Sequence, residues 1–322
     1  MKSIVTIGGG TGQYALLTGL KKYPVRLTAI VSMADDGGST GILRDELGVL
    51  PPGDVRQCLV ALSEADVLMR DLFTYRFDKG GLRGHSFGNI FLSTLEKLTG
   101  SFEEAVLESS RILAVRGKVI PVSVGGMTLV CGKDGELRGE HAISRAALND
   151  SGTLKLEPEA YANPRAVEAI EGADAIIIGP GDLYCSIIPN LLVRGVADAI
   201  KRSKAILVYN CNLMTKRGHT DGFSVSDYVR EIENRIGEGR INFVTWNESA
   251  PNPTLLQKYA REGQPVGPIK TGEMTKFKLI GADLVSLRVP VQNPGDVIER
   301  TLIRHDSDVL ANILIEKCLG GV

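Results

Sequence analysis

The first residues that could do chemistry form the run GGGTG at residues 8–12, directly after a short apolar stretch at 3–7. Glycine lets a backbone turn tightly and bring its N–H groups against an oxygen-rich ligand, and a helix pattern that follows adds the positive end of its dipole. The run is not a Walker A motif, and it fits GxGxxG poorly. We expect it to hold a phosphate, and a strand-to-helix turn without a ligand is the alternative. The candidate contacts are Gly9, Gly10, Thr11 and Gly12.

Two adjacent carboxylates lie in a second glycine-rich segment, SMADDGGSTG at residues 32–41, which follows the apolar segment 25–31. Neighbouring carboxylates are costly unless a cation or a hydrogen-bond donor compensates them. Mg²⁺ that bridges to a phosphate would do so, and so would the hydroxyl groups of a ribose. Turn capping by Asp or Ser explains one of these carboxylates without any ligand. The candidate ligand contacts are Asp36, Gly37, Gly38 and Ser39.

Two further polar motifs follow in a region with a helical pattern. PPGDVR contains Asp54, which fits a helix cap, and ends on Arg56, a cation that is unfavourable in the first turn of a helix. An anionic partner would explain that arginine. GHSFGN offers His85 and Asn89 to a ligand. It contains no GxSxG elbow and has no evident Asp partner, which argues against a hydrolase triad.

A glycine loop of the same construction, GPGDLYCS at residues 179–186, follows the apolar segment 175–178. Two such loops in one chain favour a split site for the phosphates of a nucleotide. YNCNLMTK at 209–216 offers amide, hydroxyl and ammonium groups to a sugar, base or phosphate, although ordinary loop polarity explains them equally well. The candidate contacts in these segments and before the last helix are Gly181, Asp182, Asn210, Thr215 and Arg304.

The elements that must position these residues alternate between strand and helix patterns, which predicts parallel strands with helices on both faces of a sheet. In such sheets ligands bind outside the carboxyl ends of the strands, where the strand order reverses. The candidate loops directly follow expected strands. We expect strands over 3–7, 25–32, 174–178, 205–210, 241–246 and 284–291, and helices over 11–22, 187–202, 225–236 and 306–319.

The fold class predicted from this alternation is α/β: a Rossmann-like, doubly wound, mostly parallel sheet with a helical and β-hairpin elaboration. No repeat and no linker divides the chain, so we expect residues 1–322 to form a single nucleotide-binding domain. The elaboration is expected at about 54–144. It is helical at first and continues as short strands over 121–144, around the turn Lys133-Asp134-Gly135.

Composition and charge exclude several classes of protein. The net charge is −1 and no run of five basic residues occurs, so the chain has no electrostatic footprint for nucleic acid or a membrane surface. The five cysteines are odd in number and form no CxxC pair, which indicates reduced thiols rather than a disulfide framework. No signal peptide and no stretch of about 18 apolar residues is present. We expect a cytoplasmic protein.

The motifs GGGTG, SMADDGGSTG, PPGDVRQCL, GHSFGN, GPGDLY and YNCNLMTKRG occur in this order between Ile4 and about Arg304. In this combination the chain resembles the gluconeogenesis factor family, within the superfamily that includes 2-phospho-L-lactate transferase. The resemblance implies a Rossmann-like core in a cytoplasmic bacterial protein that binds UDP-N-acetylglucosamine. It also implies a role in carbon flux between gluconeogenic growth and the cell wall, and hence in cell shape.

The transferase branch of the superfamily moves a phospholactyl group from a guanosine diphosphate carrier onto a deazaflavin. The resemblance places its metal-binding aspartates at Asp36 and Asp54. DDGGSTG and GHSFGN are more similar to the gluconeogenesis factor branch, for which no reaction is implied. The chain departs from the family pattern at Lys216 and His219, where Gln and Glu are expected, in the wall that would contact the sugar.

Three functions remain open at this point. A regulatory binder would hold the UDP-sugar or a related nucleotide without a required cofactor, and would act through a protein partner or as a homo-oligomer. A transferase would use Mg²⁺ to polarise a diphosphate-linked substrate and would need no nucleophile from the protein. A nicotinamide-dependent oxidoreductase is disfavoured by the poor match to GxGxxG. We expect the regulatory binder.

Overall fold

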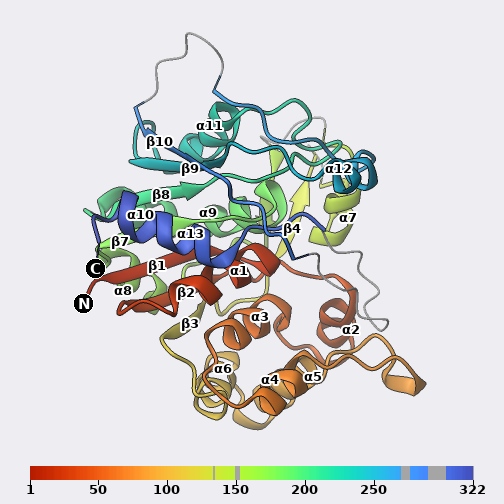
Figure 1. Ribbon diagram of the computed structural model, residues 1–322. Helices are drawn as coiled ribbons and strands as arrows, with labels where there is room; N and C mark the ends of the chain where they lie inside the picture. Colours follow the sequence, from red (N-terminus) through yellow and green to blue (C-terminus); the bar gives the residue numbers. More distant parts are fainter. Residues whose placement is uncertain (133–134, 149–152, 270–275, 289–301, 322) are drawn as a thin grey trace.

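The structure, a computed structural model, describes residues 1–132, 135–148, 153–269, 276–288 and 302–321 (Figure 1). Its centre is a sheet of seven strands in the order β10-β9-β8-β7-β1-β2-β3, with every pair parallel. The strands are β1 (Ser3–Gly8), β2 (Arg26–Val31), β3 (Lys118–Pro121), β7 (Ala175–Ile178), β8 (Ile206–Asn210), β9 (Phe243–Asn247) and β10 (Lys278–Ala282).

The strand order reverses between β1 and β7. From β1 the chain builds outward through β2 to β3, then returns to the other side of β1 and builds outward again from β7 to β10. Ile4 pairs with Leu27 of β2 on one side and with Ala175 of β7 on the other. The predicted Rossmann-like, doubly wound class is confirmed, and it brings the loops after β1 and β7 together at one edge of the sheet.

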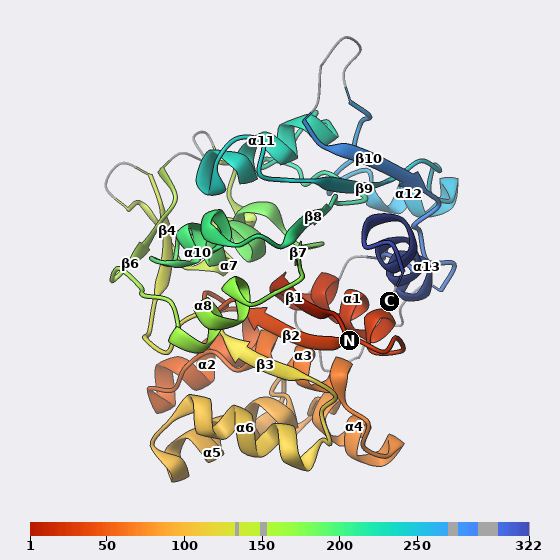
Figure 2. The same cartoon turned by 90° about the vertical axis from the view of Figure 1, so that its left-hand side faces the viewer.

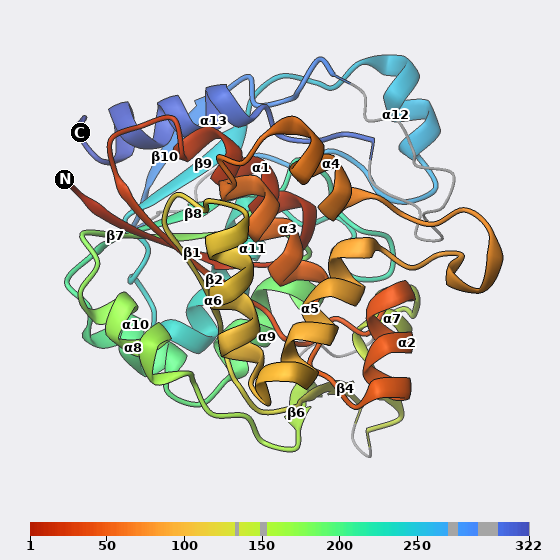
Figure 3. The ribbon, with the colours of Figure 1, turned by 90° about the horizontal axis from the view of Figure 1, so that it is seen from below.

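The central strands are apolar because helices cover both faces of the sheet (Figures 2 and 3). Every side chain of β7 is buried, and so are those of Ile4 to Ile7 in β1. The exception in polarity is Thr6, whose hydroxyl accepts a hydrogen bond from Gln13 Nε2 at 3.0 Å. Helix α1 (Gly10–Leu20) packs against α3 (Gly53–Leu62) and α13 (Ser307–Ile313). Helix α10 (Val196–Arg202) packs against α8 (Pro164–Glu171), α9 (Ile188–Leu192) and α11 (Val225–Ile236).

Two insertions interrupt the alternation of strands and helices. Helices α2 to α6 lie between β2 and β3, and an antiparallel sheet in the order β5-β4-β6 lies with α7 between β3 and β7. The small strands are β4 (Thr128–Cys131), β5 (Leu137–Arg138) and β6 (Lys155–Glu157). The helices are α1 (Gly10–Leu20), α2 (Gly38–Leu47), α3 (Gly53–Leu62), α4 (Val67–Thr74), η1 (Gly80–Leu82), α5 (Phe87–Thr99), α6 (Phe102–Ile112), α7 (Glu140–Arg145), α8 (Pro164–Glu171), η3 (Leu183–Ile187), α9 (Ile188–Leu192), α10 (Val196–Arg202), α11 (Val225–Ile236), α12 (Pro253–Tyr259), α13 (Ser307–Ile313) and η4 (Leu314–Cys318).

The helix expected over 187–202 is wrong as a single element. It is split into η3, α9 and α10, with a break before Val196. Gly195 takes a φ of 98° there, a backbone conformation that favours glycine. The N–H of Arg194 donates to Ala160 O, and the carbonyl of Arg194 accepts from the N–H of Ala162. The chain therefore leaves the helix because its backbone pairs with another segment.

Two strand predictions are also wrong in position. The last strand of the sheet is β10, and residues 284–286 instead form backbone hydrogen bonds with 304–306. Residues 289–291 of the expected strand lie outside the described residues, as do Lys133 and Asp134 of the expected turn. Residues 140–144 belong to helix α7, whose amino end is held by a carboxylate from a distant loop. Local sequence gives no signal for that contact.

The two insertions overlap the region 54–144, where the elaboration was expected, and extend beyond both of its ends. The first helix inserted after β2 begins at Gly38, and the small sheet ends at Glu157. The strand β3, inside that range, belongs to the main sheet. The assignment of the chain to one domain stays a prediction. Within the described ranges, no helix combines the length and apolar character needed to cross a membrane.

Candidate nucleotide-binding cavity

A cavity of about 650 Å³ lies where the loops after β1, β7 and β8 meet. This is the edge of the sheet at which the strand order reverses, the usual position of a ligand in a doubly wound fold. A volume of this size falls in the range of small-molecule sites. Among the residues predicted from the sequence, the lining includes Gly9, Gly10, Thr11, Gly12, Gly181, Asp182, Thr215 and Arg304.

The loop after β1 comes closer to its neighbours than any side chain would allow. Gly9 caps α1, and a Cβ placed on it would lie 2.3 Å from Asp54 Oδ2. Gly10 has a φ of 64°, in the left-handed region that favours glycine. A Cβ on Gly12 would lie only 2.2 Å from the carbonyl oxygen of Pro180. The glycines therefore let the two loops pack directly on each other beside the amino end of α1.

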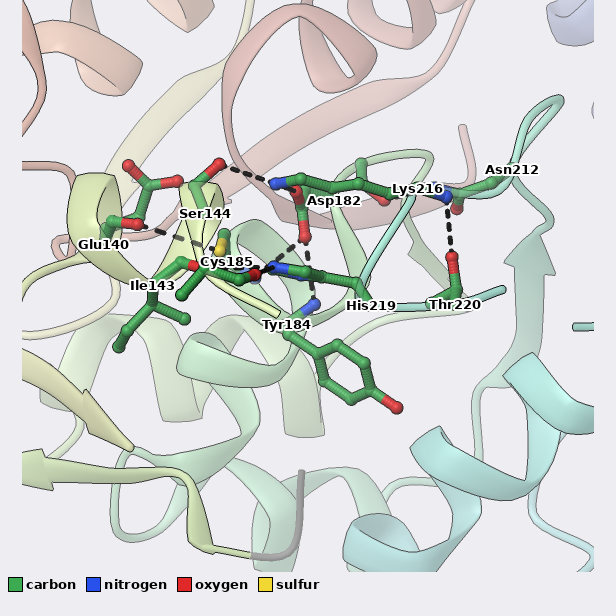
Figure 4. Close-up of polar contacts among 12 residues, drawn as sticks. Glu140, Ile143, Ser144, Asp182, Tyr184, Cys185, Asn212, Lys216, His219 and Thr220 are labelled. Carbon is green, nitrogen blue, oxygen red and sulfur yellow. Dashed lines mark hydrogen bonds and ion pairs between the residues drawn. The ribbon is translucent and has the colours of Figure 1, made fainter. Parts of the chain in front are cut away.

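The loop after β7 is organised by Asp182. Its Oδ1 accepts the N–H groups of Tyr184 at 3.2 Å and Cys185 at 3.1 Å, which caps η3. Its Oδ2 lies 2.5 Å from Nζ of Lys216, which also donates to Ser144 Oγ at 2.6 Å (Figure 4). Asp182 thus joins the β7 loop to the β8 loop and, through Lys216, to α7.

Electrostatics keep this pair ionised. Burial is the largest single effect on the pKa of Asp182 and would raise it, but the charge and hydrogen bond of Lys216, together with His219 and the N–H of Cys185, lower it on balance. Burial likewise would lower the pKa of Lys216, but Asp182, Cys185 and Glu140 together raise it. Lys216 therefore remains an ammonium at neutral pH and cannot act as a base toward the hydroxyl of Ser144. The arrangement suits charge compensation rather than nucleophilic catalysis.

The charged side chains that line the cavity are mainly cations. The cations are Arg145, Lys216, Arg217, Arg261 and Arg304, and the carboxylates are Asp182 and Glu262. This surplus, next to the positive end of a helix, favours a ligand with more than one negative charge. The chain as a whole carries a net charge of −1, so the cationic character is a local property of this cavity.

The predicted residues of the β2 loop and the helical insertion form a separate cluster of hydrogen bonds around Ser39. Its hydroxyl oxygen lies 3.2 Å from His85 Nδ1 and accepts from Asn89 Nδ2 at 3.3 Å. Arg56 Nε donates to Asn89 Oδ1 at 2.8 Å and Arg56 Nη1 to the carbonyl of Phe73 at 3.2 Å. This cluster joins α2, α3 and α5, and within the described residues none of these four predicted side chains lines the cavity.

Asp36 and Asp54 have different surroundings. Asp36 Oδ1 accepts the N–H of His141 at 2.7 Å, which fastens the β2 loop to α7. Asp54 lies in the first turn of α3, whose cap position is occupied by Pro52, so the prediction of Asp54 as the cap is wrong. Its Oδ2 lies against the backbone of Gly9 instead. Asp54 is therefore the closer of the two to the glycine loop.

The remaining predicted residues support the loops. Asn210 is fully buried, donates to the carbonyl of Gly179 at 3.2 Å and accepts from Thr245 Oγ1 at 2.9 Å, so it braces the ends of β7, β8 and β9. Thr215 Oγ1 accepts the N–H of Gln264 at 3.0 Å. The backbone positions that begin α2 are Gly37, its N-cap, and Gly38, with a φ of 48°.

Glu140 is a residue that the sequence did not bring forward. It stands at the start of α7, and its pKa is raised well above the usual range by burial and by the carboxylates of Asp35, Asp182 and Asp54. Four carboxyl groups therefore converge beside the glycine loops. The segment was expected to form a strand, and contacts with distant residues, among them Asp36 and Cys185, place Glu140 there.

Comparison with known proteins places the chain among its relatives. The family model for 2-phospho-L-lactate transferase CofD matches residues 4–285. The gluconeogenesis factor of Halalkalibacterium halodurans is 40% identical, over 98% of this chain and 96% of that protein. The gluconeogenesis factor of Bacillus subtilis is 38% identical, over 97% of each. The chain belongs to the gluconeogenesis factor family.

Solved structures agree with this membership. A crystal structure of a protein from Bacillus halodurans, described as a member of the UPF0052 family, superimposes with a TM-score of 0.86. It is 39% identical, and the match covers 98% of this chain and all of that one. The resemblance inferred from six motifs is thus confirmed, together with the fold class. The roles of the individual site residues stay predictions.

Proposed function

We propose that this member of the gluconeogenesis factor family binds a nucleoside diphosphate sugar, UDP-N-acetylglucosamine, in the cavity described above. We further propose that it acts as a regulatory factor needed for carbon flux to the cell wall and for cell shape. One observation carries the binding proposal: two glycine loops meet where the strand order reverses, in front of a cavity whose charged lining residues are mainly cations. Family membership supports the regulatory role.

The diphosphate would lie against the backbone of residues 9–12, where the amino end of α1 offers N–H groups. Lys216 and Arg304 both line the cavity and would compensate its charge. Nζ of Lys216 already donates to Asp182 and Ser144, so a ligand phosphate would take its third N–H or replace one of these partners. Asp36 would act indirectly, by positioning α7 and with it Ser144 and Arg145.

The test is a thermal shift measurement with UDP-N-acetylglucosamine, GDP and NADP, each with and without Mg²⁺. A ligand at 100 times its dissociation constant adds about 2.7 kcal/mol to the free energy of unfolding. We expect the UDP-sugar to stabilise the protein without Mg²⁺, and Lys216→Met to reduce that shift. Lys201→Met, an exposed lysine on α10, is the matched control and should leave the shift unchanged.

Other outcomes would point elsewhere. A shift that requires Mg²⁺ and favours GDP would move the conclusion to a transferase, and a response to NADP alone would favour an oxidoreductase. No response to the UDP-sugar under any condition would refute the proposed ligand. The protein partner or second copy that a regulatory factor would use to pass on its state can then be sought with and without the ligand.

A specific observation keeps a Mg²⁺-dependent transferase as the second candidate. The family model that matches 4–285 is that of 2-phospho-L-lactate transferase, and Asp54 and Asp35 lie with Glu140 beside the glycine loop. Carboxylate oxygens are ligands that Mg²⁺ accepts, and a bound Mg²⁺ would polarise the diphosphate of the substrate. Asp36 fits less directly, because its Oδ1 is held by the backbone of His141.

A further inference from the structure

Asp182, Cys185 and His219 form a compact group in the wall of the cavity (Figure 4). One potential ligand atom from each lies within 4.8 Å of the other two, and in the part of the chain that the structure describes no other group of His, Cys, Asp or Glu meets this criterion. We propose that these three side chains bind a divalent transition metal ion of the zinc type. The site is distinct from an oxygen-ligand Mg²⁺ site at Asp54.

The His219 ring is oriented as a metal ligand would be. Its Nε2 lies 3.0 Å from the carbonyl oxygens of both Ile143 and Ala146, and carbonyls only accept, so Nε2 bears the hydrogen. The lone pair is then on Nδ1, which is buried and has no hydrogen-bond partner among the described residues. His219 itself is only 7% exposed. Metal-bound histidines typically donate their other ring N–H to a carbonyl, which is the arrangement seen here.

The other two ligands are also oriented by their surroundings. Two backbone N–H groups hold Oδ1 of Asp182, so the carboxylate has one fixed direction. Cys185 follows three residues later in η3, and its buried Sγ lies 3.9 Å from the carbonyl of Glu140. Carboxylate, thiolate and imidazole together make a set that suits zinc better than magnesium. A fourth position would be open toward the cavity, which Asp182 and His219 line.

The local charge favours a cation as well. The buried Cys185 lies near the carboxylates of Asp182 and Glu140, which disfavour a further negative charge on its sulfur. A metal ion reverses this effect, because its own charge stabilises the thiolate. In the structure the ammonium of Lys216 compensates Asp182, at 2.5 Å from Oδ2. Lys216 is therefore the group that a metal ion would displace from Asp182, and Ser144 Oγ already provides it with a second partner.

The experiment is a titration of the chelator-treated, reduced full-length protein with Co²⁺, which reports a bound thiolate through a charge-transfer band in the near ultraviolet. We expect a saturable band that Zn²⁺ removes and Mg²⁺ does not. Cys185→Ser and His219→Gln should abolish it. Cys318→Ser, which changes a buried cysteine at the far end of the chain, should retain it.

Lys216→Met provides the second measurement, with a readout that a misfolded variant could not mimic. Nζ of Lys216 lies 2.5 Å from a carboxylate oxygen of Asp182, so removing its positive charge should tighten Co²⁺ binding by roughly tenfold or more, even at a high effective dielectric constant. The proposal is overturned if the native protein gives no band, if the band survives in Cys185→Ser, or if Lys216→Met leaves the affinity unchanged or weaker. These results are independent of whether a UDP-sugar binds.

Discussion

The two sides of the cavity edge contain carboxylates in opposite electrostatic situations. In the loop after β7, Asp182 is paired with Lys216 and its pKa is lowered. On the side of the β2 loop, burial together with Asp35, Asp182 and Asp54 raises the pKa of Glu140. Two carboxyl groups near the same glycine loops thus lie in opposite local fields. The difference arises from side chains that approach from elsewhere in the chain, and not from the loops themselves.

Gly12→Ala tests what both sides share, the direct packing of the two glycine loops, and should have the largest effect. The new Cβ would lie 2.2 Å from the backbone oxygen of Pro180, which cannot move as a flexible side chain could. We expect a loss of roughly 3 kcal/mol in the free energy of unfolding and no stabilisation by the UDP-sugar. Denaturant unfolding with and without ligand measures both effects.

The control for that substitution is Gly81→Ala. Gly81 lies in η1, and a Cβ placed on it would have nothing within 4 Å, so the same chemical change should leave stability and ligand response near the native values. If Gly12→Ala is as stable as Gly81→Ala, the two loops are not packed as the structure has them. The two carboxyl groups, Asp182 and Glu140, could then not be compared as neighbours of one pair of packed loops.

Asp182→Asn removes the ion pair between Asp182 and Lys216 in the loop after β7. It leaves the ammonium of Lys216 without its carboxylate, and we expect a cost of about 1–2 kcal/mol at pH 7. The folded pKa of Asp182 is lowered, so its contribution is present above the unfolded pKa of about 4 and is lost as the pH falls through the folded value. The difference between native protein and variant should therefore shrink below about pH 4 in thermal unfolding.

A double variant distinguishes the contribution of the ion pair between Asp182 and Lys216 from that of the other hydrogen bonds of Asp182. Asp182→Asn combined with Lys216→Met removes both charges, and it should cost less than Asp182→Asn alone because no unpaired ammonium remains. Equal costs for the single and the double variant would mean that the contact of 2.5 Å contributes little to stability. The cap hydrogen bonds to Tyr184 and Cys185 would then account for the effect of Asp182→Asn.

Much of the fold could be predicted because the central strands are short, mainly apolar segments and because glycine-rich loops follow β1, β2 and β7. Helix α11 spans Val225–Ile236 as expected, and α13 and η4 together cover 307–318, within the helix expected over 306–319. The errors lie where the backbone is determined by distant partners. Arg194 leaves its helix to pair with Ala160 and Ala162, and α7 begins where a carboxylate of the β2 loop holds its first turn.

The site follows the same rule. The positions of residues 9–12 and 179–182 at the cavity were predictable, since both loops follow strands that are adjacent where the order reverses. The partners of their side chains were not, because Lys216 is 34 residues from Asp182 in sequence and Ser144 is 72 residues from Lys216. The hydrogen bonds from Ser39 to His85 and Asn89 similarly join separate helices, and no local pattern indicates them.

Glu140→Gln tests the carboxyl group whose pKa is raised. It should have the smallest effect on the free energy of unfolding, and it should increase that free energy where the earlier variants decrease it. Glu140 ionises in the unfolded chain above a pH of about 4, while in the folded protein its raised pKa favours the protonated form up to a higher pH. Its carboxyl group therefore lowers stability progressively as the pH rises from there toward the folded pKa. Glutamine has nearly the same shape and does not ionise, so we expect a gain of about 1 kcal/mol at pH 7.

Thermal unfolding of native protein and Glu140→Gln at pH 4 and pH 7 measures this gain. The two proteins should unfold at similar temperatures at pH 4, where the carboxyl group is mostly neutral in both states, and the variant should be the more stable at pH 7. A variant that is less stable at pH 7 would show that Glu140 is ionised and compensated in the folded protein, as Asp182 is. The carboxylates beside Gly9 would then also be balanced by cations, and the contrast between the two sides of the cavity would disappear.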